Sequence, residues 1–207
     1  MKTILIFYSV ILSFVILLHS PVQPVQAADQ NSSEPAKATF AGGCFWCMEK
    51  PFESLDGVEA VISGYTAGTG KDPNYQNYAA GGHIEAVEIL YDPAMIFYEQ
   101  LLDVFWRQID PTDPDGQFVD RGHAYTTAIF YHDEQQKTAA EKSRQALSAG
   151  NIFSKPIVTP ILSATTFYPA EEYHQDYYRK NPLRYKFYRY GSGRDKFLDN
   201  IWGKERD

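Results

Sequence analysis

The sequence predicts an α+β fold: a two-layer ferredoxin-like sandwich with a mixed or antiparallel sheet and C-terminal additions. The main observation is the order of the elements, because strand-like and helix-like segments follow one another as β-α-β-β-α-β, the order of the split βαβ sandwich. The second is size, since 207 residues, 44% of them apolar, are enough for one well-buried domain. Helices are expected to cover one face of the sheet.

The first half of the core contains three strands and one helix. Alternation of apolar and polar residues predicts the later strands, and in the last of them Glu85 shares a face with Val87 and Ile89. The expected elements are a strand at 37–41, a helix at 44–55, and strands at 58–67 and 83–91.

The second half continues with a helix in which Phe97, Leu101 and Phe105 are spaced four apart, which is typical of an amphipathic helix. Asp133 is suited to cap the next helix. The expected elements are a helix at 97–109, a strand at 124–132, a helix after Asp133 to about residue 148, a strand at 157–164 and a short helix at 170–180. Turn-rich stretches at 68–82 and 110–123 interrupt this order, and the first is long enough to be a functional loop. The aromatic, basic tail has no assignment.

The first 27 residues have the layout of a secretory signal peptide. Lys2 precedes an apolar run from Ile4 to Leu18, and small residues stand near Ala27. Residues 28–36 read as a flexible leader, and the domain is expected at 37–207. The protein is therefore expected outside the cytosol, in the periplasm or extracellular space. An uncleaved N-terminal membrane anchor is the alternative.

The charge of the chain argues against a nucleic-acid partner. With 19 basic and 26 acidic residues the net charge is −7 at pH 7, whereas nucleic-acid binders normally carry a basic patch. No apolar interface stripe is evident in the sequence, so a monomer is expected.

The only two cysteines, Cys44 and Cys47, lie in the stretch GGCFWCME. A disulfide between them would close a loop of two residues and stabilise little, so a structural crosslink is disfavoured. A structural zinc site needs four ligands, and no histidines at H-x(3–5)-H spacing complete one, so no metal is expected.

A redox role fits the pair better. Cys44 stands where a helix is expected to begin, and the free N–H groups and dipole of a helix N-terminus favour a reactive thiolate there. Cys47 lies one turn later on the same helix face, so it can attack whatever forms on Cys44.

Two kinds of redox protein remain. A thioredoxin-like exchanger also carries C-x-x-C at a helix N-terminus, but it needs a proline loop in a βαβ context, and Thr159-Pro160 lies far along the chain. A substrate-specific enzyme would use Phe45 and Trp46, between the cysteines, as an exposed apolar wall beside the nucleophile.

Further motifs narrow this choice. In chain order they are GGCFWCMEKPF from Gly42, Gly64-Tyr65 with Gly68, Pro73-Asn74-Tyr75, GHIEAV at Gly82–Val87, Tyr91–Pro93, and the D-x-G-x-x-Y of Asp120–Tyr125. Taken together and in this order, these motifs resemble those of the peptide methionine sulfoxide reductases of the A type, in a variant whose active-site motif reads GCFWC. The resemblance runs from about residue 38 to residue 182.

The resemblance implies a repair reaction at sulfur. Cys44 would attack the sulfur of methionine S-sulfoxide, free or in an oxidised protein, and become a sulfenic acid as methionine leaves. Glu85 would be the acid that protonates the sulfoxide oxygen, which requires burial to raise its pKa. Phe45 and Trp46 would hold the S-methyl group of the substrate.

Three further site residues follow from the same resemblance. Tyr75 and Tyr125 would donate hydrogen bonds to the sulfoxide oxygen, and Asp120 would order the site. No cofactor is implied.

The chain differs from many members of the family in the cysteines that return the nucleophile to its thiol form after each turnover. They carry glycine at the position of Cys47 and keep resolving cysteines in the tail, which has none here. Cys47 is therefore expected to resolve the sulfenic acid, and a thioredoxin-like donor to reduce the Cys44–Cys47 disulfide. The alternatives are a general thiol–disulfide oxidoreductase and a non-catalytic domain that binds methionine-rich or oxidised peptides.

Overall fold

The computed structural model describes residues 35–203, which lie within one compact unit. The predicted signal peptide and all but the end of the predicted leader lie outside the described residues. Within residues 35–203, no helix combines the length and apolar character needed to span a membrane.

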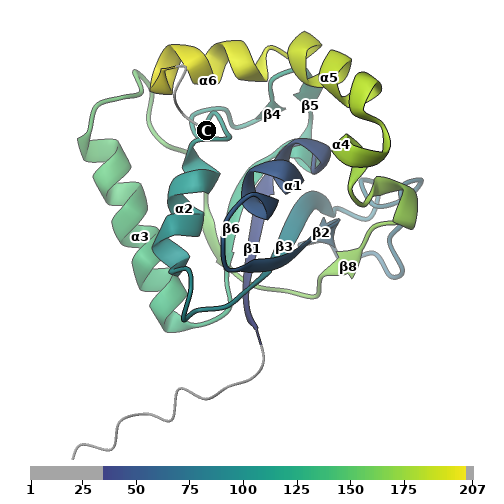
Figure 1. Ribbon diagram of the computed structural model, residues 1–207, viewed down its shortest axis with the longest axis horizontal. Helices are drawn as coiled ribbons and strands as arrows, with labels where there is room; N and C mark the ends of the chain where they lie inside the picture. The colour runs from purple at the N-terminus through teal and green to yellow at the C-terminus, as the bar shows by residue number, and fades with distance from the viewer. Residues whose placement is uncertain (1–34, 204–207) are drawn as a thin grey trace, which may run out of the picture. The chain divides into compact units, whose positions relative to one another are not determined.

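The strands and helices follow the predicted order, with additions (Figure 1). In the core they are β1 (Ala36–Gly42), α1 (Trp46–Glu53), β2 (Val58–Thr66), β3 (Ile84–Tyr91), α2 (Tyr98–Trp106), β4 (Gly116–Gln117), β5 (Asp120–Arg121), η1 (His123–Tyr125), β6 (Thr127–Tyr131) and α3 (Glu134–Ala149). The later elements are β7 (Ile161–Ser163), β8 (Tyr168–Pro169), η2 (Glu172–His174), α4 (Tyr177–Lys180), α5 (Pro182–Gly191) and α6 (Arg194–Trp202).

The main sheet confirms the predicted fold class. Its strand order is β7-β6-β1-β3-β2-β8. The strands β6, β1, β3 and β2 are antiparallel to one another, as in a ferredoxin-like sheet, and β8 is antiparallel to β2. The edge strand β7 instead pairs in parallel with β6. In this register Tyr65 of β2 stands opposite Glu85 of β3.

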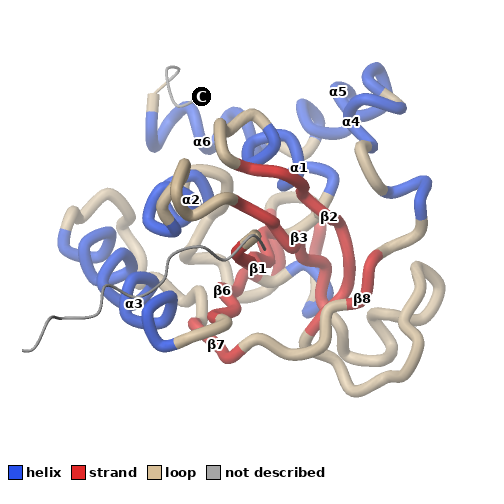
Figure 2. The backbone as a smooth tube through the Cα atoms, turned by 60° about the horizontal axis from the view of Figure 1, so that its bottom comes forward, coloured by secondary structure: helices blue, strands red, loops and turns tan. Residues whose placement is uncertain are grey.

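Helices cover one face of this sheet, as predicted. Figure 2 shows α1 and α2 side by side along the strands. Phe40 of β1 stacks with Phe105 of α2 and Phe52 of α1, at centroid distances of 4.9 and 5.5 Å, and all three rings are fully buried. The opposite face has a smaller apolar cluster, which includes Ile84 and Phe130 and packs against Phe167.

Several predicted boundaries were wrong for local reasons. The helix expected from residue 44 begins at Trp46, because the chain first turns at Gly43, which has a positive φ of 79°. The helix expected at 170–180 is broken by Asp176, whose φ is 53°. The strand expected at 124–132 begins only at Thr127, after η1, and the strand expected at 157–164 is reduced to β7.

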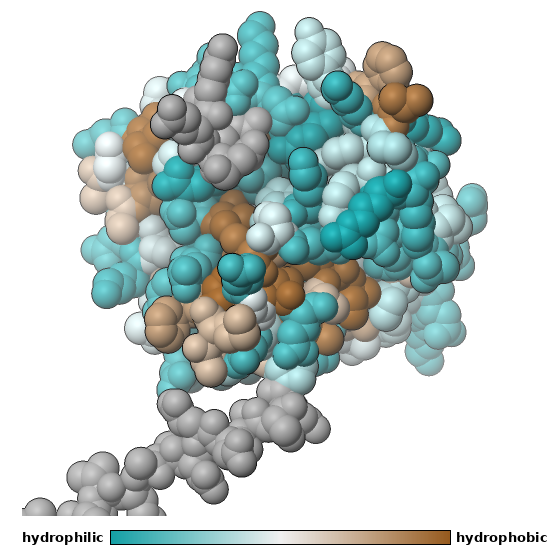
Figure 3. Space-filling model, in the orientation of Figure 1, coloured by the Kyte–Doolittle hydropathy of each residue, from teal (hydrophilic) through white to brown (hydrophobic). Residues whose placement is uncertain are grey.

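The unassigned tail forms two helices that pack back on the domain. Asn181-Pro182 starts α5, with proline in the first turn, where its missing N–H costs no hydrogen bond. Leu198 and Arg194 of α6 are fully buried. The outer face of α5 instead exposes Leu183, Phe187 and Tyr190, and apolar side chains are visible there at the upper right of Figure 3.

Candidate active site

The two cysteines lie in the tight passage from β1 into α1. Gly43 is required, because its φ is 79° and a Cβ there would lie 2.6 Å from Gln117 Cβ. A Cβ at Gly42 would lie 2.4 Å from Met48 Sδ and would displace that side chain. The passage buries both thiols: Cys44 is 6% exposed and Cys47 is fully buried. They are free thiols in this structure.

The electrostatics of the pair differ from the sequence prediction. Burial raises the pKa of the Cys44 thiol well above its usual value, and interaction with Cys47 and the charge of Glu85 act in the same direction. The pKa of Cys47 falls to about 6, chiefly through its interaction with Cys44 and then through the charges of Arg194 and Arg189, against the effect of burial. In the substrate-free protein these electrostatics therefore favour a thiolate at Cys47 over the thiolate that the sequence predicted at Cys44.

Glu85 lies near Cys44, and its environment favours the protonated carboxyl that an acid catalyst needs. Its carboxyl accepts hydrogen bonds from the Phe45 backbone N–H (3.0 Å) and the Tyr78 hydroxyl (2.8 Å) and is 2% exposed. Burial raises the pKa of Glu85 to about 8, although both hydrogen bonds act in the opposite direction. The group is therefore mainly a neutral carboxylic acid at pH 7.

The long loop 68–82 supplies tyrosines to the site. The hydroxyl of Tyr78, a residue that the sequence reasoning missed, also lies 3.4 Å from the Tyr125 hydroxyl. Burial raises the pKa of Tyr125 to about 12, so this phenol stays protonated. Tyr75 is 41% exposed and its ring stacks on Tyr78 at 6.1 Å. Tyr78 could have been suspected from the sequence, because it lies three residues after Tyr75 in the same loop.

A tyrosine of the C-terminal tail connects Asp120 to the site. The Tyr188 hydroxyl of α5 donates a hydrogen bond to Asp120 Oδ2, and it also interacts with the Cys44 thiol. Tyr188 therefore links the carboxylate to the nucleophile. No sequence pattern indicated this residue, because the tail had no predicted structure.

The two aromatics between the cysteines have different environments. Phe45 is 1% exposed and packs in the core, so the expectation that both rings form an exposed wall was wrong for Phe45. Trp46 is partly exposed and stacks on Tyr177 at 3.7 Å, and its indole N–H donates to His174 Nδ1 at 3.1 Å. The His174 ring also lies 4.6 Å from the Tyr75 ring, so these residues form an aromatic surface beside Cys44.

A second buried carboxylate holds this aromatic surface in place. Glu49 of α1 accepts hydrogen bonds from Ser63 Oγ (2.9 Å) and from the backbone N–H groups of Asp176 (3.1 Å) and Tyr177 (3.3 Å). Burial raises the pKa of Glu49 to about 7. These contacts fix the segment that stacks Tyr177 on Trp46.

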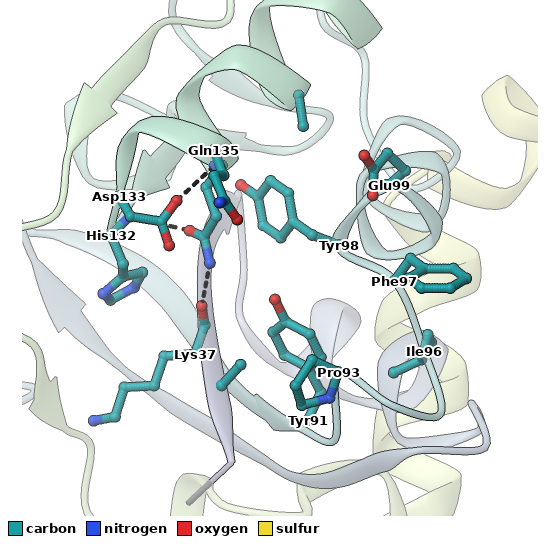
Figure 4. A pocket seen from close by; sticks show the side chains of 13 residues that line it. Lys37, Tyr91, Pro93, Ile96, Phe97, Tyr98, Glu99, His132, Asp133 and Gln135 are labelled. Atoms are coloured by element: carbon teal, nitrogen blue, oxygen red, sulfur yellow. Dashed lines mark hydrogen bonds between the residues drawn. The ribbon is translucent and has the colours of Figure 1, made fainter. Parts of the chain in front are cut away.

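One cavity of the described residues lies away from the site. It has a volume of about 410 Å³ and surrounds the start of β1, with Tyr91, Tyr98 and His132 among its lining side chains (Figure 4). Because β1 rises ~3.3 Å per residue, Gly42 lies roughly 20 Å from that end of the strand. Among residues 35–203, no cluster of three or more His, Cys, Asp or Glu side chains is arranged to hold a metal ion.

Comparison with known proteins points to one family. The family model described as "Peptide methionine sulfoxide reductase" matches residues 36–206. Peptide methionine sulfoxide reductase MsrA of Listeria monocytogenes is 57% identical over 168 residues, which cover 80% of this chain and 95% of that protein.

Solved structures are similar in fold. Mxr1 from Saccharomyces cerevisiae in reduced form aligns with a TM-score of 0.68 at 29% identity, covering 73% of this chain and 88% of that chain. A second structure, Mxr1 in complex with Trx2, aligns with a TM-score of 0.51 at 23% identity, covering 73% and 91% respectively.

Proposed function

The chain belongs to the peptide methionine sulfoxide reductase family, and we propose that it reduces the S epimer of methionine sulfoxide through Cys44 and Cys47. The observation that carries the proposal is the neutral Glu85 carboxyl, which accepts a hydrogen bond from the backbone N–H of the residue next to Cys44. A thiol and a neutral acid side by side can add to sulfur while protonating the oxygen on it.

The first step is attack by Cys44. Its sulfur bonds to the sulfoxide sulfur as its proton passes to the Cys47 thiolate, and Glu85 protonates the sulfoxide oxygen. The hydroxyls of Tyr78, which bonds to Glu85, and of Tyr125, next to Tyr78, would hydrogen-bond that oxygen in the proposed step. The hydroxyl then passes from the substrate sulfur to the Cys44 sulfur, as the sulfur–oxygen bond of the substrate and the new sulfur–sulfur bond break. Methionine leaves as a thioether and Cys44 becomes a sulfenic acid, so the substrate sulfur is reduced and the Cys44 sulfur is oxidised.

The second step forms the disulfide. Cys47 gives its proton to the Glu85 carboxylate and attacks the Cys44 sulfur; the S–O bond breaks, and the hydroxide takes a proton from Glu85 to leave as water. Cys44 and Cys47 belong to one turn of four residues. Their sulfurs can therefore bond without a large movement of the backbone.

The substrate surface follows from the aromatic residues beside Cys44. Trp46 keeps part of its ring open to solvent, with His174 and Tyr75 next to it. An apolar, polarisable surface of this kind suits the S-methyl group of the substrate. Phe45 is buried and packs against Tyr65 and His174, so it supports this surface from within the core.

The disulfide must be reduced before the next turnover, and a thioredoxin-like dithiol is the proposed donor. Disulfides are reduced by thiolate attack through a mixed disulfide, which a protein dithiol completes with its second thiol. The similar yeast protein Mxr1 has been solved in complex with Trx2, which supports this class of partner.

The test is an assay with the two sulfoxide epimers of a blocked methionine and dithiothreitol. We expect the S epimer alone to be consumed, because one placement of the methyl group directs the oxygen to Glu85. Consumption of neither epimer would contradict the reductase function. Reduction of an unrelated protein disulfide without sulfoxide turnover would instead support a general thiol–disulfide oxidoreductase.

Export of the protein is also proposed, on the strength of the first 27 residues. Lys2, the apolar run Ile4–Leu18 and the small residues before Ala28 are typical of a cleaved signal peptide. N-terminal sequencing of the protein outside the cytosol should therefore begin at Ala28. Recovery of the chain in the cytosol with Met1 or Lys2 at its start would contradict export.

A further inference from the structure

Two arginines of the C-terminal helices lie beside the cysteine pair, and the mechanism above assigns them no role. Arg189 of α5 donates from Nη1 to the backbone carbonyl of Cys47 at 3.1 Å. Arg194 of α6 donates from Nη2 to the carbonyl of Gly42 at 3.0 Å and from Nη1 to that of Gln108 at 2.6 Å. Both guanidinium groups therefore bind the backbone that carries the cysteines.

Arg194 is a buried charge that lacks an ordinary counter-ion. The residue is 1% exposed, and its Nε has no hydrogen-bond partner. Besides the two carbonyls, its guanidinium contacts Met48 Sδ and lies over the Phe118 ring at 4.6 Å. No carboxylate in residues 35–203 forms an ion pair with it. An isolated buried cation is costly, so a nearby anion would be stabilised strongly.

The positive charges of both arginines favour the anionic form of the Cys47 thiol. Tyr177 and Tyr185 pack around Cys47 and exclude solvent, so the charges of Arg189 and Arg194 are little screened there. Asp195 binds Arg189 Nε at 2.8 Å and offsets part of one charge. The titratable and charged groups that act on Cys47 are Cys44, Glu85, Asp120, Tyr185, Tyr188, Arg189 and Arg194. Among them only the two arginines are cations.

We propose that Arg189 and Arg194 are positioning residues that hold Cys47 as the anionic member of the pair, both when it attacks Cys44 and when it leaves Cys44 during reduction. This rests on the proposed function for its place in the cycle. In the first role, the cations favour the thiolate that attacks the sulfenic acid. In the second role, a stabilised thiolate is the better leaving group, since leaving is faster for the thiol of lower pKa.

Because Cys47 leaves as the thiolate, the sulfur that the reductant attacks is that of Cys44. Cys47 is fully buried behind the tyrosines, whereas Cys44 is 6% exposed in the substrate site. A dithiol reductant therefore attacks Cys44: the Cys44–Cys47 bond breaks, Cys47 leaves as a thiolate, and a mixed disulfide forms at Cys44. The second thiol of the reductant then attacks its own sulfur in the mixed disulfide, Cys44 is released and takes up a proton, and the reductant ends as a disulfide. Reductant and methionine sulfoxide accordingly compete for one site.

The role of the arginines is tested by titrating the thiolate absorbance at 240 nm in the reduced protein. In the wild type one thiolate should titrate near pH 6. Arg194→Met and Arg189→Gln should each move that midpoint up by about one unit or more, a loss of about tenfold in the thiolate fraction at pH values well below the wild-type midpoint. Arg194→Lys should restore most of it, because the charge is kept. Arg184→Gln, on the exposed face of α5, is the matched control and should leave the titration unchanged.

Arg194→Met can also destabilise the fold, because the residue is buried. Near-UV circular dichroism shows whether this variant is folded correctly. If it is not, the test is made with Arg189→Gln alone. An unchanged midpoint in the correctly folded neutral variants would overturn the proposal. This titration needs no methionine sulfoxide, so its failure is distinguishable from failure of the epimer assay.

The attacked sulfur is tested on protein oxidised to the disulfide. It is mixed with excess thioredoxin whose second active-site cysteine is serine, quenched in acid, alkylated with N-ethylmaleimide in denaturant and cut with chymotrypsin after Trp46. Mass spectrometry should find thioredoxin on Cys44 and maleimide on Cys47. Thioredoxin attached to Cys47 would overturn the assignment.

Discussion

Glu85→Gln is expected to slow methionine formation by about 10²–10⁴-fold, the usual contribution of general acid catalysis. Glutamine keeps the shape of the side chain and can still accept the hydrogen bond from the Phe45 N–H, but it has no proton to release to the sulfoxide oxygen. The measurement is methionine formed in a single turnover, by rapid quench, with enzyme in excess and no reductant.

The pH dependence of the same step identifies the acid. Because burial raises the pKa of Glu85 to about 8, the wild-type rate should be sustained near neutral pH and fall as the pH rises through about 8, where the proton is lost. The glutamine variant should lack this fall. Glu88→Gln is the matched control: it lies on the same strand, and its carboxylate pairs with Lys37 at 3.3 Å. A near-normal rate in Glu85→Gln would place the acid elsewhere.

Cys47→Ser is expected to release about one methionine per chain and then stop, because nothing remains to resolve the sulfenic acid on Cys44. Steady-state activity with a thioredoxin-like dithiol protein should be lost almost completely. The measurement is methionine released against time at known enzyme concentration, with the mass of the stalled protein, which should increase by one oxygen.

The matched variant for this experiment is Cys44→Ser, which should release no methionine at all, because the nucleophile itself is gone. Small dithiols are left out, since they can reduce a sulfenic acid directly. If Cys47→Ser cycled on the protein dithiol at the wild-type rate, Cys47 would not be the resolving cysteine.

The core of the fold could be predicted from local patterns. Alternation in HIEAVEILY places Glu85 on the face that it shares with Val87 and Ile89, and the helix spacing after Phe97 places Leu101 and Phe105 in the core. Both patterns depend only on residue type and period, so a single sequence carries them. The boundaries that failed, at Gly43 and Asp176, are set by positive φ values that periodicity does not reveal.

The candidate site was predictable only where its residues stand in motifs. Tyr78 and Tyr188 were missed because their roles depend on contacts across 7 and 68 residues of chain, with Glu85 and Asp120 respectively. The exposure of Phe45 was misjudged for a related reason. A ring at a helix start is buried only when other elements, here Tyr65 and His174, pack against it.

The sequence by itself determined the order of the elements, the cysteine pair at a strand-to-helix passage and the strand face on which Glu85 lies, because each depends on neighbours within a few residues. Tertiary structure alone decided which cysteine the electrostatics favour as the thiolate. The dipole of α1 favours a thiolate at Cys44, but burial outweighs it there, and Arg189 and Arg194, which lie 142 and 147 positions after Cys47, stabilise the charge on Cys47 instead. Electrostatic energy depends on distance and solvent exclusion in the folded protein, and neither can be read from spacing along the chain.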